Sequence, residues 1–443
     1  MTLSVYVQGR EVATLEAIGD FKSSLAYREE VAPDDFVSLT MRVRSEPWVW
    51  DDVLHPVFQM NLPEGYLLQV LQEQFGPHIG ASPTALLSVI GRNMIGRIQV
   101  AAPSTDLDLP PKPVDVADLL QGDNSEEAFA ELVRQHATSG VSGVVPKFLD
   151  DGTEHAALER HKKASLLTHR HIIKGSSRLL PFVSLNEHLC MQVVRQIMPA
   201  ANTEVSRDGK ALVVQRFDLD ENGARHWGME DFCALLGLRP AAKYDTTWER
   251  IAKAVRDHVP VEGRLQAFRG MSTLLLLIYA LRNADCHAKN VALLYSRAED
   301  VHLAPAYDMI TTAAYPEYAN NPPAISFMGR KTWDPGKSLQ TFITATFGVT
   351  VREQAELVDQ IATAMTAVGP QVRAAMVEHP DFAEIGKRML HNWQEGVAGL
   401  RDKRTYALGD VSLGDAFIGF SDLEPVKAKR HVIGRSDLIG RNP

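Results

Sequence analysis

The chain has 443 residues, of which 45% are hydrophobic and 23% are charged, a composition typical of a soluble globular protein with more than one domain. Its 46 basic and 55 acidic residues give a net charge of −9, which argues against a general nucleic-acid-binding protein. The three cysteines are too few and too scattered for a disulfide framework or a zinc site. The first 19 residues alternate as a strand does, unlike a signal peptide, and the longest apolar run, at residues 274–281, is too short to span a bilayer. We therefore expect a cytoplasmic protein.

The N-terminal part of the chain predicts a small α+β unit. Alternating apolar residues over 3–27 predict two strands around a glycine-centred turn, and residues 36–43 predict another strand. Residues 51–75 change to helical spacing. Residues 82–100 predict a helix that begins at Ser82 and a strand that follows a glycine-bounded turn.

A stretch rich in proline and acidic residues, 102–120, is the predicted linker to the rest of the chain. It is followed by a predicted helix at 125–137, a Gly/Ser-rich turn at 138–148 and short strands at 171–174 and 211–217. Helical spacing dominates after these strands. The predicted helices there are 229–238, 247–259, 264–283, 353–369 and 370–380.

This order of elements predicts an α+β, bilobal, kinase-like fold. It consists of a small α+β N-terminal subdomain and a β-rich lobe, followed by a large, mainly helical C-terminal lobe. A β-rich lobe before a helical lobe, with charged motifs near their junction, is typical of a nucleotide-binding enzyme. The predicted segments are the N-terminal subdomain at 1–103, the linker and connecting helix at 104–138, the nucleotide-binding β-rich segment at 139–228 and the helical lobe at 229–443.

The segment NADCHAKN, residues 283–290, follows a nearly continuous apolar run. Its Asp285 and Asn290 match the D-x-x-x-x-N of a kinase catalytic loop, in which the aspartate orients or deprotonates the acceptor hydroxyl and the asparagine binds Mg²⁺. Asp308, after a later strand-like segment, matches the second metal ligand. One amide oxygen and one carboxylate, together with phosphates and waters, suit Mg²⁺. Taken alone, the motif also fits a helix end followed by a turn.

Lys174 ends a strand of otherwise apolar residues, where a charge is costly to bury without a partner. A kinase would place this ammonium on the α- and β-phosphates and hold it with Glu187 of the following helix; a surface lysine at a strand end is the simpler alternative. Residues 140–147 can form a nest of backbone N–H groups around phosphate, or a plain hairpin, and they lack the Walker A spacing. The strand end at 215–217 can present its backbone to an adenine edge.

Taken in order, these motifs resemble the HipA family of bacterial toxin kinases, serine/threonine kinases of type II toxin–antitoxin modules. The resemblance runs through most of the chain. It rests on VFQMNLPEGYLLQVL (57–71), LLSVIGRNMIGRIQV (86–100), GVSGVVPK (140–147), HIIK (171–174), NEHLCMQVV (186–194), VQRFD (214–218), NADCHAKN (283–290) and APAYDMI (304–310).

The resemblance implies a HipA-like kinase fold, ATP and Mg²⁺ as cofactors and Asp285 as the catalytic base. It also implies Asn290 and Asp308 as metal ligands, with Glu187 as the partner of Lys174. The ATP-binding residues that it implies are Ser142, Gly143, Val144, Val145, Pro146, Lys147, Lys174, Gln215, Arg216, Phe217, His287, Lys289, Asn290, Tyr307 and Asp308.

The resemblance further implies partners and regulation. Family members phosphorylate aminoacyl-tRNA synthetases, of which glutamyl-tRNA synthetase is the best known, and a small helix-turn-helix HipB-type antitoxin that binds operator DNA neutralises them. This protein would then reach DNA only through its antitoxin, and no membrane partner is expected. Ser142 is the candidate for autophosphorylation, in a loop that departs from the family pattern at Gly140 and Val145. Cys286 replaces the glycine beside the catalytic aspartate, and we expect an inert, packed thiol there.

Two alternatives stay open. A small-molecule kinase similar to the aminoglycoside phosphotransferases would also use a D-x-x-x-x-N loop, although the N-terminal subdomain and the loop at 140–147 count against it. A catalytically silent, antitoxin-binding co-repressor would have lost a metal ligand, and the motifs show no such loss. The basic stretch at 427–441 is expected to be a solvated terminus rather than a DNA-binding patch.

Overall fold

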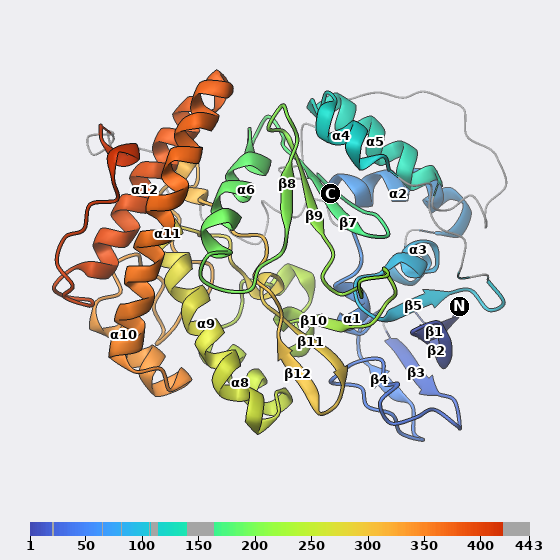
Figure 1. Cartoon of the computed structure of the whole chain (residues 1–443). Coiled ribbons are helices and arrows are strands. Elements are labelled where there is room, and N and C mark those ends of the chain that lie inside the picture. The colour runs from blue at the N-terminus through green and yellow to red at the C-terminus, as the bar shows by residue number, and fades with distance from the viewer. Residues whose placement is uncertain are drawn as a thin grey trace.

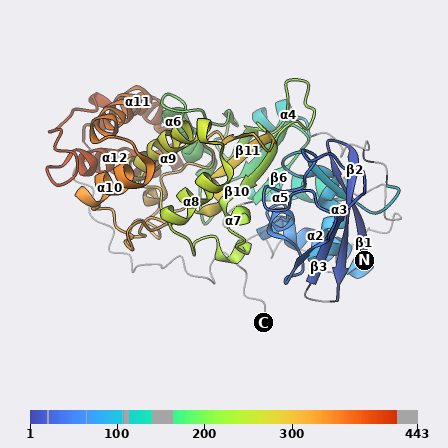
Figure 2. The ribbon, with the colours of Figure 1, turned by 90° about the horizontal axis from the view of Figure 1, so that it is seen from below.

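The computed structural model describes residues 1–19, 22–63, 65–80, 82–105, 107, 114–139 and 164–419. The strands in these ranges form three antiparallel sheets, with five, four and three strands. Figure 2 shows the five-stranded sheet at one end of the molecule and the long helices α11 (Val351–Glu378) and α12 (Ala383–Arg401) at the other. The fold is therefore mixed α+β with a helical C-terminal region, as the order of predicted elements indicated.

The N-terminal unit is built on the five-stranded sheet. Its elements are β1 (Thr2–Val7), β2 (Arg10–Ile18), β3 (Lys22–Tyr27), β4 (Trp48–Trp50), α1 (Pro56–Gln59), α2 (Gly65–Ile79), α3 (Pro83–Ile90), η1 (Gly91–Asn93) and β5 (Ile98–Ala101). The strand order is β4-β3-β2-β1-β5. Leu3, Val5 and Val7 of β1 lie in the core of this unit, as the period of two predicts. The Ser82 hydroxyl accepts a hydrogen bond of 3.2 Å from the Ala85 N–H, so α3 begins where the sequence predicted.

The predicted strand at residues 36–43 was wrong. One isolated bridge, between Ser38 and Met41, occurs there, and β4 forms the edge of the sheet. The Ser38 hydroxyl and the Leu39 N–H donate hydrogen bonds of 2.7 and 2.6 Å to the carboxylate of Glu230 in the C-terminal lobe. Residues 36–43 form a turn whose polar groups bond the buried carboxylate of Glu230. The apolar residues of this segment are therefore buried because the segment packs against the C-terminal lobe, and not because it pairs in a sheet.

A four-stranded sheet with helices on both faces follows (Figure 1). Its elements are α4 (Val116–Gln121), α5 (Glu126–Ser139), β6 (Ala164–Leu167), β7 (His171–Gly175), α6 (Val183–Val194), β8 (Thr203–Val205) and β9 (Ala211–Gln215). The strand order is β6-β7-β9-β8. In β9, Val213 joins a core with residues of α2, α4 and α5, whereas Leu212 and Val214 join the core that contains α6. Burial on both faces explains the continuous apolar run of this strand.

The C-terminal lobe surrounds the buried second half of one helix, α9 (Val261–Leu281). Besides α11 and α12, its elements are β10 (Gly228–Asp231), α7 (Phe232–Leu235), η3 (Pro240–Ala242), α8 (Trp248–His258), η4 (Ala288–Asn290), β11 (Ala292–Arg297), β12 (Asp300–Leu303), η5 (Thr312–Ala314), α10 (Lys337–Phe342), η6 (Ile343–Phe347), η7 (Pro380–Phe382) and η8 (Asp415–Phe417). Every residue of α9 from Met271 to Leu281 is buried, and α8, α11, α12 and β12 pack around the helix. This half of α9 is apolar on nearly all sides because neighbouring elements cover it on all sides.

Two helix predictions in this lobe needed correction. The segment 229–238, predicted as a helix, begins as β10, which pairs with β11, and only Phe232–Leu235 is helical. The predicted helices 353–369 and 370–380 form one helix, α11, with Pro370 inside it. Proline removes a hydrogen bond of the helix, but the packing of α11 along α6, α9 and α12 holds its two halves in line.

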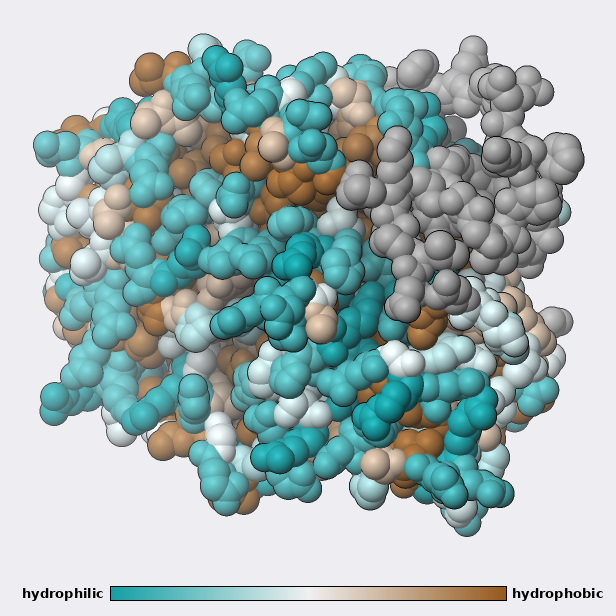
Figure 3. Space-filling view, turned by 45° about the vertical axis from the view of Figure 1, so that its right-hand side comes forward, coloured by the Kyte–Doolittle hydropathy of each residue, from teal (hydrophilic) through white to brown (hydrophobic). Residues whose placement is uncertain are grey.

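One face of the molecule is mostly hydrophilic. Figure 3 shows hydrophilic residues over most of one face, with hydrophobic residues gathered in smaller patches. Val261, Val377 and Ile418, which are 68%, 83% and 67% exposed, lie on three different parts of the chain. Singly exposed hydrophobic residues are normal on a globular protein. Within the described ranges, no helix is both long enough and apolar enough to cross a membrane.

Candidate active site

The lysine in β7 lies between two carboxylates. Lys174 Nζ is 2.7 Å from Glu187 Oε1 and 2.8 Å from Asp308 Oδ1. The Glu187 side chain is only 3% exposed, whereas those of Lys174 and Asp308 are 21% and 22% exposed. Helix α6 packs beside β7. The buried carboxylate of Glu187 on α6 therefore holds the Lys174 ammonium group, which remains partly exposed to solvent.

Asp308 reaches the same point from the segment that follows β12. Its backbone has a φ of +57°, a left-handed conformation that non-glycine residues rarely adopt and that is found preferentially at functional sites. The side-chain amide of Asn290 donates a hydrogen bond to Asp308 Oδ2, and Asn290 Oδ1 accepts one of 3.2 Å from the His287 N–H. The structure thus gathers Lys174 and Asn290 around the carboxylate of Asp308.

Asp285 follows the buried end of α9. The helix ends at Arg282, whose backbone is left-handed with a φ of +55°. Beyond it, the Ala284 N–H donates to Thr312 Oγ1 at 2.7 Å, and the Asp285 N–H donates to Asn283 Oδ1 at 2.9 Å. Asn283 is completely buried. The long apolar run therefore provides a rigid base for the loop that carries Asp285.

One residue that no motif indicated contacts this aspartate. The Tyr244 hydroxyl donates a hydrogen bond of 2.7 Å to Asp285 Oδ1. Tyr244 lies in the connection between η3 and α8, and its ring meets the ring of His287 edge to face, with 5.0 Å between the centroids. A single tyrosine outside any motif carries no signal in the sequence, so only the folded chain reveals this contact.

His287 and Cys286 are both buried beside Asp285. Burial lowers the pKa of His287 to about 3, so its imidazole is neutral at neutral pH. Its Nδ1 atom has no hydrogen-bond partner in the described part of the chain. Burial raises the pKa of the Cys286 thiol well above its usual value, which agrees with the inert, packed cysteine that the sequence predicted.

Aromatic contacts join three of the predicted ATP-binding segments. The Tyr307 hydroxyl donates a hydrogen bond of 2.7 Å to the carbonyl oxygen of Lys289. The Tyr307 ring also lies beside that of Phe217, with 5.9 Å between the centroids. The loop with Asp285, the segment with Asp308 and the end of β9 therefore lie side by side, although they are far apart in the sequence.

The backbone of the predicted adenine edge is partly engaged within the protein. The Gln215 N–H donates to the carbonyl oxygen of Asn202, and the Arg216 N–H donates to that of Arg170, each at 2.9 Å. The Gln215 side chain accepts a hydrogen bond of 3.1 Å from the Asn202 amide. These contacts fix the edge of the sheet at this point.

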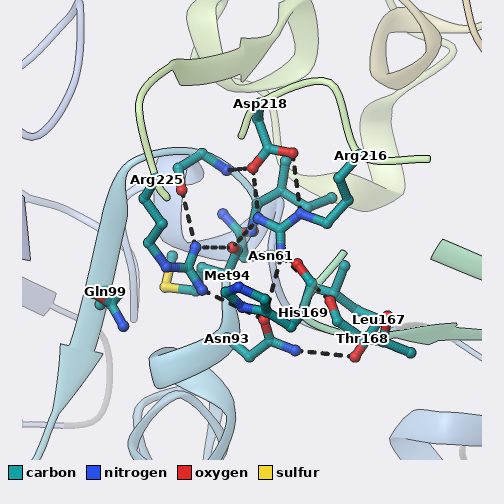
Figure 4. Close-up of polar contacts among 12 residues, drawn as sticks. Asn61, Asn93, Met94, Gln99, Leu167, Thr168, His169, Arg216, Asp218 and Arg225 are labelled. Carbon is teal, nitrogen blue, oxygen red and sulfur yellow. Dashed lines mark hydrogen bonds and ion pairs between the residues drawn. The ribbon is translucent and has the colours of Figure 1, made fainter. Parts of the chain in front are cut away.

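The side chain of Arg216 ties this edge to the N-terminal unit (Figure 4). It pairs with Asp218, with 2.5 Å between Nη2 and Oδ2, and donates a hydrogen bond of 2.9 Å to the Met94 carbonyl oxygen. Asp218 also accepts a hydrogen bond of 2.7 Å from the Gly96 N–H, and Arg225 donates one of 2.5 Å to Met94. Burial opposes the ionisation of Asp218, but the hydrogen bonds and charge of Arg216 keep its pKa below the usual value. The turn before β5 therefore supports the predicted adenine edge.

Some predicted site residues cannot be placed. The phosphate-binding residues Ser142, Gly143, Val144, Val145, Pro146 and Lys147 lie outside the described residues, as do Gly140 and the basic stretch 427–441. Their predicted tasks stay predictions.

The described side chains include no group of three or more His, Cys, Asp or Glu residues that could hold a metal ion. Asn290 and Asp308 instead offer one amide and one carboxylate side by side. Mg²⁺ at nucleotide sites uses one or two protein oxygen ligands and completes its shell with phosphates and waters. The two residues supply the oxygen types that such an ion uses, although the Asn290 amide nitrogen faces Asp308 here and its Oδ1 accepts from the His287 N–H.

Two family models match the chain. Residues 3–101 match the HipA N-terminal domain, and residues 139–369 match the HipA-like C-terminal domain. The second match alone covers more than half of the chain. Asp285, Asn290, Asp308 and Lys174 all lie within it.

Individual proteins show the same similarity. The chain is 26% identical over 352 residues to "Putative kinase Y4dM" and 29% identical over 344 residues to "Putative kinase Y4mE", both of Sinorhizobium fredii (strain NBRC 101917 / NGR234). Each match covers 71% of this chain and 78% of the relative. Among solved structures, it is similar to HipA in a complex of Shewanella oneidensis MR-1 HipA, HipB and operator DNA, with a TM-score of 0.64 and 17% identity. That match covers 92% of this chain and 100% of the other, and it shows that the two chains share a fold.

Proposed function

The chain belongs to the HipA family, and on this premise we propose that it is an ATP- and Mg²⁺-dependent protein serine/threonine kinase. The observation that carries the proposal is the cluster in which Lys174 meets both Glu187 and Asp308 while Asn290 meets Asp308. A kinase needs a lysine on the nucleotide phosphates, a carboxylate that orients it, and oxygen ligands for the metal. Here Lys174 lies within hydrogen-bonding distance of both carboxylates, and Asn290 lies within that distance of Asp308.

Each residue of the cluster has one task in the proposed reaction. The Lys174 ammonium places positive charge on the α- and β-phosphates. Asn290 and Asp308 hold Mg²⁺, which supplies charge neutralisation on the phosphates when it is bound. Asp285 orients the acceptor hydroxyl and takes its proton as the hydroxyl oxygen attacks the γ-phosphorus, while the bond from the γ-phosphorus to the bridging oxygen breaks and ADP leaves. Lys289, on the same loop, adds positive charge beside the transferred group.

The nucleotide base is proposed to bind at residues 215–217. Because the N–H groups of Gln215 and Arg216 already bond protein carbonyl groups, the base meets the remaining backbone groups of this edge. The neighbouring rings of Phe217 and Tyr307 offer an apolar surface beside it. Residues 142–147 are proposed to enclose the triphosphate, and His287 supports the catalytic loop from within.

We further propose that the protein is the toxin of a HipBA-type toxin–antitoxin pair. The support is the family membership together with the Shewanella oneidensis HipA, which was solved in complex with HipB and operator DNA. The partner would be a HipB-type helix-turn-helix antitoxin, through which the kinase reaches DNA. The substrate would be a protein of translation, an aminoacyl-tRNA synthetase such as glutamyl-tRNA synthetase, and Ser142 would be the site of autophosphorylation.

Transfer of labelled phosphate from ATP to lysate proteins tests the kinase proposal. Asp285→Asn keeps the side-chain shape but cannot accept a proton, so we expect transfer to fall by about 100-fold or more. The matched control is Asp257→Asn, which changes a half-exposed carboxylate of α8 that pairs with Lys253, and we expect the wild-type rate. Identification of the labelled band names the substrate. A wild-type protein that neither binds ATP nor transfers phosphate would contradict the proposal and favour a silent, antitoxin-binding partner.

A further inference from the structure

The loop that carries Asp285 is held by a second segment of the C-terminal lobe, residues 239–247. The Tyr244 hydroxyl donates to Asp285 Oδ1 at 2.7 Å, and the Ala288 N–H donates to the Lys243 carbonyl oxygen at 3.1 Å. Two adjacent residues of this segment thus bond the loop at two points on either side of His287. Two such attachments limit how far the loop between them can shift.

The ring of Tyr244 adds a third contact with the loop. It meets the ring of His287 edge to face, at 5.0 Å between the centroids. Because burial keeps this imidazole neutral, the contact is one between two uncharged rings and does not change between weakly acidic and neutral pH. The contact with His287 therefore holds the ring of Tyr244 in place while the Tyr244 hydroxyl bonds the Asp285 carboxylate.

The segment that carries Tyr244 is itself anchored. The Asp245 N–H donates to the Ala242 carbonyl oxygen at 2.8 Å, and the Trp248 N–H donates to the Ser326 carbonyl oxygen at 2.9 Å. Trp248 is 1% exposed and begins α8, which Thr247 caps by accepting a hydrogen bond from the third residue of the helix. A side chain on such a fixed support can hold a reacting group in one orientation.

We propose that Tyr244 is a positioning residue for phosphoryl transfer, whose hydroxyl fixes the Asp285 carboxylate toward the acceptor hydroxyl. This assignment rests on the proposed kinase function. In this assignment, Oδ1 of Asp285 accepts the hydrogen bond from the Tyr244 hydroxyl, and Oδ2 faces the acceptor hydroxyl. A hydrogen-bond donor also favours the ionised form of a carboxylate, which is the form that accepts a proton.

Tyr244→Phe removes one oxygen atom and keeps the ring that meets His287. We expect kcat to fall by about tenfold to hundredfold, since a displaced catalytic group costs on this order. We expect the dissociation constant for ATP, measured by equilibrium binding, to stay unchanged, because the lost bond is to Asp285 and not to Lys174 or Asp308. The acid limb of the rate–pH profile shifts to higher pH, because a carboxylate without its donor is protonated more easily.

The matched control is Tyr279→Phe, which removes a hydroxyl that donates to the Thr332 carbonyl oxygen at 2.9 Å. We expect it to lower the thermal midpoint while kcat and the pH profile stay those of the wild type. Wild-type or faster transfer by Tyr244→Phe, or equal losses of activity in both variants, would overturn the assignment and leave the kinase proposal intact. No transfer by the wild type would overturn the kinase proposal and the assignment together.

Discussion

At the scale of single residues, the proposed site depends on one buried carboxylate, Glu187, whose side chain is 3% exposed and 2.7 Å from Lys174. Glu187→Gln keeps the shape and removes the charge that orients the lysine. A charged hydrogen bond is worth about 1.5–3 kcal/mol, so we expect kcat/KM for ATP to fall by about tenfold to hundredfold. Steady-state kinetics at varied ATP concentration measures this. Glu356→Gln, in an exposed pair with Arg352, is the control, and an equal loss there would contradict the prediction.

At the scale of elements, α11 depends on the cap at its start. The Thr350 hydroxyl accepts a hydrogen bond of 3.2 Å from the Glu353 N–H, and Glu353 in turn accepts one of 2.9 Å from the Thr350 N–H. Thr350→Ala removes this reciprocal cap, and we expect the free energy of unfolding to fall by about 1 kcal/mol in a denaturant titration. Thr363→Ala, in the exposed middle of α11, should cost less, because its hydroxyl only bonds a carbonyl group of the same helix. A larger loss at Thr363 would contradict the prediction.

At the scale of the whole molecule, a buried ion pair joins the N-terminal unit to the predicted adenine edge. The side chains of Arg216 and Asp218 are 0% and 3% exposed. Asp218→Asn leaves a buried guanidinium without its counter-charge, and we expect a loss of about 3–5 kcal/mol in the free energy of unfolding. Asp257→Asn breaks an ion pair with Lys253 in which the two side chains are 50% and 72% exposed, and it should cost less than about 1 kcal/mol. Chemical denaturation followed by tryptophan fluorescence compares the two variants, and similar losses would show that burial does not decide the cost.

Local chemistry in the sequence predicted much of this molecule. Alternation over residues 3–27, the Ser82 cap and the apolar run of α9 each depend on neighbours in the chain, so a sequence reader can find them. The segments 36–43 and 229–238 were predicted wrongly, because docking on Glu230 and pairing of β10 with β11 overrode their local patterns. Motif order was enough to nominate Lys174, Glu187, Asn290 and Asp308, which the folded chain brings together.

The sequence by itself thus determined the family and most of the order of elements, and it nominated the residues for kinase chemistry, since spacing along the chain carries all three signals. Only the tertiary structure decided that Tyr244 bonds Asp285 and that Arg216 reaches the turn at Met94. Both contacts join segments that are distant in the sequence. Such contacts arise from the packing of whole elements. A hydroxyl or guanidinium group that bonds across packed elements has no partner at a fixed distance along the sequence, so no sequence pattern reveals the contact.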